Sequence, residues 1–242
     1  EANFISETQL LLCPELLYQD DENPENLHWT EIDPRIDWLL EILIQLSPEK
    51  ILVITASTQT ALDIAQAIKT ITGQHIPVFH EHMNLIARDR AAAFFADNES
   101  GCQLLVCSEI GSEGRNFQFA HHLVLFDLPL NPDLLEQRIG RLDRIGQTET
   151  INIHIPYLEN SAQAVMLHWY QQGLNAFEHI CAAGQTVFLQ VESELNAALH
   201  QRKNSDDLLK LINTTQSTNQ ALNEALHRGR DKLLEYNSFR PE

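Results

Sequence analysis

The stretch QRIGRLDRIGQ at residues 137–147 concentrates positive charge in an acidic chain. Arg138, Arg141 and Arg144 follow one another at strict three-residue spacing, although the 242 residues contain only 16 Lys and Arg against 34 Asp and Glu. An arginine is always charged, and its planar guanidinium can bridge two oxygens of a phosphate group. The cluster therefore predicts a local site for a ligand that carries phosphate.

The overall charge restricts nucleic-acid binding to local sites. A formal net charge of -18 repels phosphate over a Debye length of about 8 Å, which argues against a broad, sequence-independent DNA footprint. Hydrophobic residues make up 43% and charged residues 21%, the composition of a chain that folds. At 242 residues the chain is long enough for one large domain, or for one medium domain with an appendage.

The cysteines and the apolar runs set expectations about compartment and metals. The four cysteines form no CxxC pair, so neither a disulfide framework nor a zinc site is indicated, and a reducing compartment is expected. No apolar run approaches the ~20 residues that span a bilayer. We therefore expect a cytoplasmic protein with no membrane contact. We also expect no metal site, because His80 and His82 lack further ligands nearby.

Short apolar runs alternate with helical patterns from residue 50 to 157, which predicts βαβ units, a parallel sheet and the α/β class. Residues 51–55, 104–107 and 123–126 are apolar at consecutive positions, as strands covered on both faces should be. These three strands are expected at the centre of the sheet. Residues 151–155 alternate strictly, which predicts a last strand with one more exposed face.

Helical spacing replaces the strand pattern after residue 157. Ser161 is expected to cap the first helix of this part, and two more helices are predicted near 185–201 and 219–236. Residues 203–220 are polar, with Ser, Thr and Asn interrupting the apolar period, so a loop is expected there. The tail is therefore predicted to be a helical appendage.

Two loops that follow predicted strands carry residues suited to phosphate. In an open parallel sheet, ligands bind beyond the carboxyl ends of the strands. The loop CSEIGSEGRN at residues 107–116 follows a buried strand, and its glycines let backbone N–H groups approach a phosphate closely. The second loop contains the arginine cluster, which comes after a helix predicted to begin at Asn131 and Pro132.

Together these loops resemble motifs V and VI of helicase superfamily two. QRIGRLDRIGQ matches the QxxGRxxR pattern of motif VI, and its ending RIGQ is typical of the Swi/Snf-type translocases. Over residues 50–157, KILVITAS resembles the motif IV strand, HEHMNLIARDR the segment after it, and DLPLNPDLLEQ the usual approach to motif VI. CSEIGSEGRNFQFA and WYQQGLNAFEH are similar to the branch of this family that associates with bacterial RNA polymerase.

The resemblance implies a RecA-like three-layer domain with a mostly parallel sheet over residues 37–157, as the C-terminal lobe of a two-lobe motor. Residues 1–36 would be an arm from the preceding lobe or linker, and residues 158–242 a C-terminal α-helical extension. None of the nine glycines is followed by lysine, so the chain has no P-loop ending in Gly-Lys-Ser/Thr. We therefore expect a fragment that lacks the first lobe and is inactive alone.

The resemblance also assigns residues to ATP. Arg141 and Arg144 would face the γ-phosphate across the cleft between two lobes, as arginine fingers, and Gln137 would support that cleft. Gly114 and Asn116 align with the Gly and Asp of motif V and would contact the nucleotide. ATP and Mg would be bound mainly through the missing first lobe.

A second group of residues is assigned to nucleic acid. Ser108 aligns with the leading Thr of motif V, which touches the nucleic-acid backbone, and Glu109 beside it is placed on the same side. Arg88 aligns with the Arg of the segment that follows motif IV. Glu81 departs from the family pattern, because it replaces the usual glycine after His80.

Several alternatives stay open. Arg138 is expected to make structural or nucleic-acid contacts rather than to reach ATP, and the whole cluster could instead be a solvated helix face. Asp127 ends an apolar strand as a Walker acid does, but without a P-loop it has no Mg-ATP to hold. The resemblance implies a translocase lobe whose partners are the first lobe, nucleic acid and RNA polymerase in transcription. The competing hypothesis is a non-catalytic RecA-like protein-interaction module.

Overall fold

The computed structural model of the protein describes residues 6–18, 27–109, 117–144, 146–201 and 205–238. The chain forms two compact units. The first contains the residues up to 129 together with 137–159, and the second contains 130–136 and the residues from 160 onward. The boundary between them passes through α6 (Pro132–Ile139). The domain limits expected at residues 36 and 157 stay predictions.

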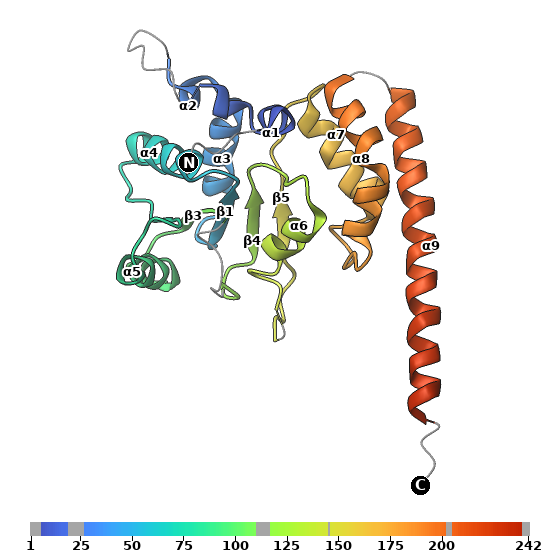
Figure 1. Ribbon diagram of the computed structural model, residues 1–242. Helices are drawn as coiled ribbons and strands as arrows, with labels where there is room; N and C mark the ends of the chain where they lie inside the picture. Colours follow the sequence, from blue (N-terminus) through green and yellow to red (C-terminus); the bar gives the residue numbers. More distant parts are fainter. Residues whose placement is uncertain (1–5, 19–26, 110–116, 145, 202–204, 239–242) are drawn as a thin grey trace. The chain divides into compact units, whose positions relative to one another are not determined.

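The first unit is built on a five-stranded parallel sheet (Figure 1). Its strands are β1 (Ile51–Thr55), β2 (Val78–Phe79), β3 (Leu104–Ser108), β4 (His122–Leu125) and β5 (Asn152–His154). Their order is β2-β3-β1-β4-β5, with Ile51 level with Leu104 and His122. Every residue of β1 and β3 is buried, which explains why the sequence shows these strands as unbroken apolar runs. The predicted α/β class and parallel sheet are confirmed.

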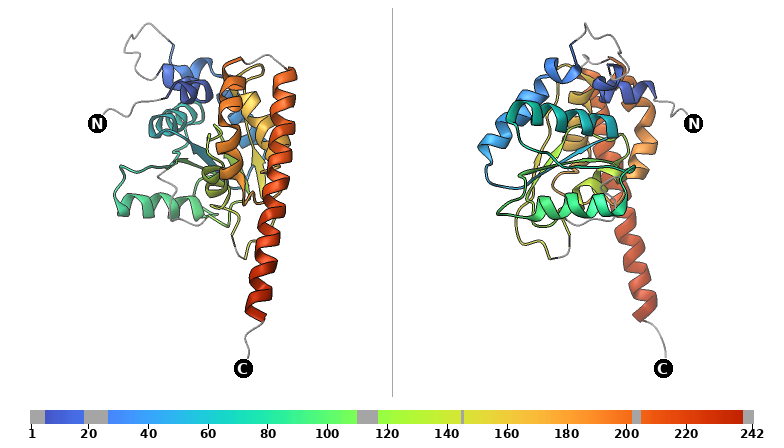
Figure 2. Two further views of the ribbon diagram at one scale, coloured as in Figure 1. Left: turned by 45° about the vertical axis from the view of Figure 1, so that its right-hand side comes forward. Right: turned by 90° about the vertical axis from the view of Figure 1, so that its left-hand side faces the viewer.

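Helices cover both faces of this sheet, so the predicted three layers are confirmed. Figure 2 shows α4 (Thr58–Thr72) on one side of the strands and α5 (Leu85–Ala96) on the other. α3 (Pro34–Gln45) packs beside α4 in the same apolar core. Ser57 caps α4, as expected, by accepting a hydrogen bond from Gln59 N–H. The caps and the apolar faces thus place the helix starts at the carboxyl edge of the sheet.

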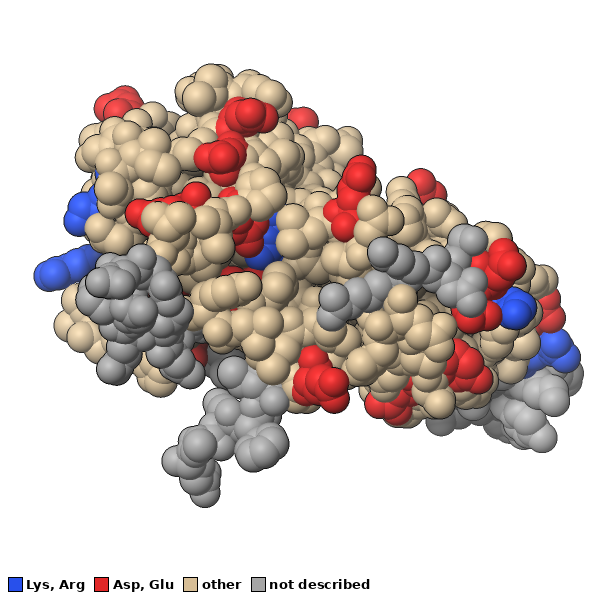
Figure 3. All heavy atoms as spheres, turned by 90° about the horizontal axis from the view of Figure 1, so that it is seen from above, with Lys and Arg blue, Asp and Glu red and all other residues tan. Residues whose placement is uncertain are grey.

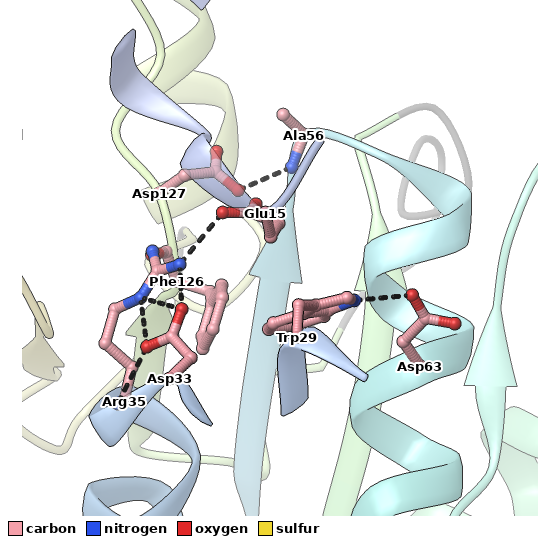
Figure 4. Close-up of polar contacts among 8 residues, drawn as sticks. All are labelled: Glu15, Trp29, Asp33, Arg35, Ala56, Asp63, Phe126 and Asp127. Carbon is pink, nitrogen blue, oxygen red and sulfur yellow. Dashed lines mark hydrogen bonds and ion pairs between the residues drawn. The ribbon is translucent and has the colours of Figure 1, made fainter. Parts of the chain in front are cut away.

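The described part of the expected N-terminal arm belongs to the first unit. It forms α1 (Glu7–Leu12), the 3₁₀ helix η1 (Pro14–Leu17) and α2 (Trp29–Ile32). Trp29 is buried in the core between the sheet and α4, and its indole Nε1 donates to Asp63 of α4 at 2.7 Å (Figure 4). A buried tryptophan dominates local packing. These residues therefore help to form the core of the first unit.

The second unit is helical, as the sequence predicts. Ser161 caps its first helix by accepting from Gln163 N–H, and Trp169 is fully buried, with Nε1 donating to the Thr215 hydroxyl at 3.0 Å. The elements in chain order are α7 (Ala162–His168), the π-helix η2 (Trp169–Leu174), α8 (Gly184–Gln201) and α9 (Ser205–Ser238). A π-helix is rare and needs local support, which the buried Trp169 supplies here.

The sequence predicts a loop within residues 203–220, and this prediction is wrong for residues 205–220, which belong to the continuous helix α9 (Figure 2). Leu211, Ile212 and Thr215 are buried on one side of it, and Thr215 accepts the indole N–H of Trp169. Burial of this side outweighs the weak helix propensity of Ser, Thr and Asn. Although α9 has 34 residues, neither it nor another described helix is both long and apolar enough to cross a membrane.

A histidine pair joins β4 to the edge strand β5. The Nδ1 of His122 and the Nε2 of His154 lie 3.0 Å apart in one hydrogen bond, and the two rings stack. Burial lowers the pKa of both imidazoles. His122 lowers the pKa of His154 further, and at His122 the raising effect of Glu49 is opposed by His121. The folded state thus takes up these protons at a lower pH than the unfolded chain.

We predict that acid weakens the fold through this pair. The stabilising contribution of each neutral ring is fully present above its unfolded pKa of about 6.5 and is lost as the pH falls below that value and through the lower folded-state pKa. In His154→Asn, the slope of unfolding free energy against pH should decrease by up to about 1.4 kcal/mol per pH unit. Urea unfolding between neutral and mildly acidic pH measures this slope, and equal slopes in both proteins would contradict the prediction.

Candidate functional site

The candidate site lies in the first unit, at the edge of the sheet where β1, β3 and β4 end. Ala56 follows β1, Glu109 follows β3, and Asp127 lies two residues after β4. Because the strands are parallel, these residues come to the same edge. Gly114 and Asn116, predicted to contact nucleotide, lie outside the described residues, so their assignment stays a prediction.

Arg138 is the centre of this edge. Its side chain, on the last turn of α6, is 1% exposed. Its terminal nitrogens donate to the Asp127 carboxylate at 3.1 Å and to the Asp127 backbone carbonyl at 2.6 Å. Its Nε donates to Glu109 at 2.9 Å, and a second terminal contact makes the Glu109 pair bidentate. One buried guanidinium therefore joins the ends of β3 and β4 to the start of the arginine cluster.

The electrostatics of this group are balanced by two carboxylates. Burial alone would lower the pKa of Arg138, but Asp127 and Glu109 outweigh burial and raise that pKa above its ordinary value. Asp127 has both oxygens engaged, because Oδ1 accepts from Arg138 and Oδ2 accepts from Ala56 N–H at 2.8 Å. The contacts favour the structural alternative for Arg138 over a contact with nucleic acid.

A second buried arginine extends the network from the N-terminal segments (Figure 4). Arg35, on the first turn of α3 and 2% exposed, pairs with Glu15 at 2.8 Å and with Asp33 at 2.6 Å. Its other terminal nitrogen donates to the Phe126 carbonyl at 3.3 Å, and its guanidinium lies 4.3 Å from the centre of the Phe126 ring. Arg35 thus supports the backbone that presents Asp127.

A thiol and two carboxyl groups meet beside these arginines. Ligand atoms of Cys13, Glu15 and Asp127 lie within 4.8 Å of one another, and all three residues are buried. Burial raises the pKa of the Cys13 thiol, which favours its protonated form, and burial also raises the pKa of Glu15, although Arg35 opposes this. The guanidiniums of Arg35 and Arg138 already supply the positive charge that the carboxylates need. The donor set therefore does not fit a divalent cation.

The remaining residues of the arginine cluster differ in exposure. Arg141 is 8% exposed, and its backbone carbonyl accepts from Phe117 N–H at 3.1 Å. Arg144 is exposed, and its Nε donates to the Gly140 carbonyl at 3.0 Å. Gln137 is exposed as well. The roles predicted for Arg141, Arg144 and Gln137 at ATP stay predictions.

The last residue of the motif has a role that sequence reasoning missed. Gln147 donates from Nε2 to the carbonyls of Gln118 at 3.0 Å and Leu142 at 3.2 Å. Its Oε1 accepts from the amides of Thr148 and Glu149. The final glutamine of RIGQ therefore closes the loop after the arginines. The only sequence signal was its place at the end of the motif.

Ser108 and Arg88, two residues predicted to contact nucleic acid, both bind Glu81. The Ser108 hydroxyl donates to Oε2 of Glu81 at 2.8 Å, and Arg88 donates to the Glu81 backbone carbonyl at 2.8 Å. Thr58, the first residue of α4, donates to the same Oε2 at 2.7 Å. Glu109 points elsewhere, to Arg138. The structure thus separates Glu109 from the pair formed by Ser108 and Arg88.

Surface charge agrees with local rather than broad anion binding. Figure 3 shows acidic side chains spread over the displayed face, with few Lys or Arg among them. The chain as a whole has 34 acidic residues against 16 Lys and Arg. A continuous basic surface, which would bind nucleic acid without regard to sequence, is not seen on that face.

Two protein families match consecutive parts of this chain. Residues 34–146 match the helicase conserved C-terminal domain. Residues 150–242 match the C-terminal domain of the RNA polymerase recycling family. The two matches meet between the arginine cluster and β5, so together they cover the sheet from α3 onward and the helical tail.

Solved structures of similar fold are ATPase domains. The C-terminal part of the Fun30 ATPase domain is 21% identical, with a TM-score of 0.52, over 72% of this chain and 57% of that one. The Sulfolobus solfataricus SWI2/SNF2 ATPase core in complex with dsDNA is 22% identical, with a TM-score of 0.51, over 68% of this chain and 34% of that one. The chain thus spans between a third and just over half of these structures. At this identity the likeness shows the RecA-like fold.

We predict that Arg138 is required for stability and that Arg144 is not. Arg138→Ala leaves Asp127 and Glu109 without their cation and should lower the free energy of unfolding by about 3–5 kcal/mol. Arg144→Ala removes the same charge from an exposed position and should change it by no more than about 0.5 kcal/mol. Urea unfolding followed by circular dichroism compares the two variants. Equal losses would show that the buried network adds no stability.

Proposed function

We propose that the chain is the second motor lobe of an ATP-dependent nucleic-acid translocase of the Swi/Snf-type branch of helicase superfamily two. Residues 34–146 match the helicase conserved C-terminal domain, and residues 150–242 match the C-terminal domain of the RNA polymerase recycling family. The observation that carries this proposal is the fixed arginine cluster. Arg138 anchors the end of α6 at the carboxyl edge of the sheet, and Arg141 and Arg144 follow at three-residue steps. Anchoring reduces the freedom that a catalytic guanidinium would lose on binding.

In this proposal ATP binds between this lobe and a first lobe. The chain contains no Gly-Lys-Ser/Thr sequence, so the P-loop and the Mg ligands belong to the first lobe. Asp127 is unsuited to Mg because both its carboxylate oxygens accept hydrogen bonds already. Arg141 and Arg144 are suited to the γ-phosphate, because guanidiniums stabilise the charge that gathers on it during transfer. Gln137, Gly114 and Asn116 are proposed to line the same cleft.

The nucleic acid along which the motor would move is proposed to contact Ser108 and Arg88. The hydroxyl of Ser108 and the guanidinium of Arg88 are groups that commonly bind nucleic-acid phosphates. Both lie in the first unit and bind Glu81, Ser108 as the last residue of β3 and Arg88 as a residue of α5. Glu109 pairs with Arg138, so it is proposed to have a structural role instead of contacting nucleic acid.

The second unit is proposed to contribute to association with RNA polymerase. Residues 150–242, which match the polymerase recycling family, include all of α7, η2, α8 and α9. The whole protein would then use movement on nucleic acid to assist transcription. The match of residues 150–242 to the C-terminal domain of the RNA polymerase recycling family supports this proposal.

We predict that the isolated chain hydrolyses no ATP. Phosphoryl transfer needs the phosphate-binding loop, its lysine and the Mg ligands, which the chain lacks. Phosphate release by the purified chain should equal that of a protein-free blank. Turnover above the blank that Arg141→Ala abolishes would contradict the assignment to a second lobe.

In the two-lobe protein, Arg141→Ala or Arg144→Ala should reduce kcat by about 10³ to 10⁵, equivalent to roughly 4–7 kcal/mol. ATP affinity should change far less, because an arginine finger meets charge that develops only in the transition state. Lysine should not restore the rate, since an ammonium cannot bridge two oxygens. Stimulated ATPase rates and nucleotide binding, measured separately, test this split.

Arg228→Ala is the matched control. Arg228 is an exposed arginine of α9 whose side chain pairs with Glu224, so the variant loses one positive charge from the second unit and leaves the arginine cluster intact. It should keep the normal rate. If Arg141→Ala and Arg144→Ala stayed within about threefold of wild type, the non-catalytic interaction module would be the better interpretation.

A further inference from the structure

Glu81 accepts hydrogen bonds from three parts of the first unit, two at its carboxylate and one at its backbone carbonyl. Its Oε2 accepts from Ser108 at the end of β3, at 2.8 Å, and from Thr58 at the start of α4, at 2.7 Å. The backbone of Glu81 is held in turn by Arg88 of α5, which donates to its carbonyl. Two hydroxyl donors, one of them on the first residue of α4, thus converge on one anionic oxygen.

These donors are of the kind that bind the phosphates of a nucleic-acid backbone. Phosphate oxygens accept hydrogen bonds from Ser and Thr hydroxyls, from arginine and from the first turns of helices. The Nε of Arg88 is buried and has no hydrogen-bond partner among the described residues, so the described part of the chain leaves one donor of this group unsatisfied. Glu81 therefore satisfies, from within the chain, donors that would otherwise suit a phosphate.

We propose that Glu81 is a built-in competitor for nucleic acid, whose carboxylate occupies the place of a backbone phosphate on Ser108 and Thr58. This inference rests on the proposed function, in which Ser108 contacts the nucleic-acid backbone. A carboxylate and a phosphate repel each other and cannot share the two hydroxyls. Nucleic acid binds at this point only after Glu81 has turned away.

The position of Glu81 allows such a displacement. Its side chain is 30% exposed, and it lies in the short segment between β2 and α5. Burial opposes its charge, but hydrogen bonds from Thr58, Ser108 and its own backbone amide lower the pKa of its carboxyl. At neutral pH the group is thus an anion in contact with water on one side, beside the exposed ring of His82.

The test measures nucleic-acid affinity in the two-lobe protein without ATP, with a labelled single-stranded oligonucleotide and a labelled duplex. Glu81→Gln keeps the size of the side chain but removes its charge, and it should tighten binding about 3- to 10-fold. Glu81→Ala removes the carboxylate altogether and should bind at least as tightly. Glu99→Gln is the matched control, because Glu99 is an exposed acid in the loop before β3, at the opposite edge of the sheet.

Ser108→Ala, made in the wild type and in Glu81→Gln, separates this inference from the proposed function. We expect it to weaken binding more in Glu81→Gln than in wild type, since the neutral amide no longer repels the phosphate that the hydroxyl would meet. If Glu81→Gln and Glu99→Gln have the same nucleic-acid affinity while Ser108→Ala still weakens binding, the proposed role of Glu81 is overturned. The proposed contact between Ser108 and nucleic acid then stands. If Ser108→Ala and Arg88→Ala change nothing in either background, the proposed contact with nucleic acid is itself overturned.

Discussion

The buried guanidinium of Arg138 is the interaction on which the candidate site depends. A charge in the interior is tolerated only where carboxylates and carbonyls satisfy it, and here Asp127 and Glu109 do so from the ends of two different strands. The requirement fixes three segments at once: the end of α6, the residues after β3 and the residues after β4. Arg141 and Arg144 follow this anchor at three-residue steps.

The same three-residue spacing produces three different environments. Arg138 is enclosed, Arg141 is largely buried beyond the end of α6, and Arg144 is exposed. The arginines of a motif that looks uniform in sequence therefore differ in burial, because α6 ends at Ile139 and the chain turns at Gln147. An arginine that supports the fold and arginines that can meet a ligand are placed within seven residues of one another.

The fold could be predicted from sequence where a strand is buried on both faces or where a helix begins at a serine cap. The apolar runs of β1 and β3 and the caps Ser57 and Ser161 are short-range signals. The partner of Glu109 could not be predicted, because Arg138 lies 29 residues away and carboxylates beside glycines suit a ligand equally well. Leu211, Ile212 and Thr215 show the same limit, since only packing against Trp169 reveals that their segment is helical.

The pairing of Arg35 also sets the true start of the folding unit. The helicase match begins at residue 34, yet Glu15 and Asp33, the two carboxylates that neutralise Arg35, both precede it. A protein trimmed to the matched region would keep the guanidinium against Phe126 and lose both counter-charges, an arrangement that costs several kcal/mol. The region that matches the helicase domain therefore excludes both carboxylates that pair with Arg35, and the N-terminal helices belong to the same compact unit as the sheet.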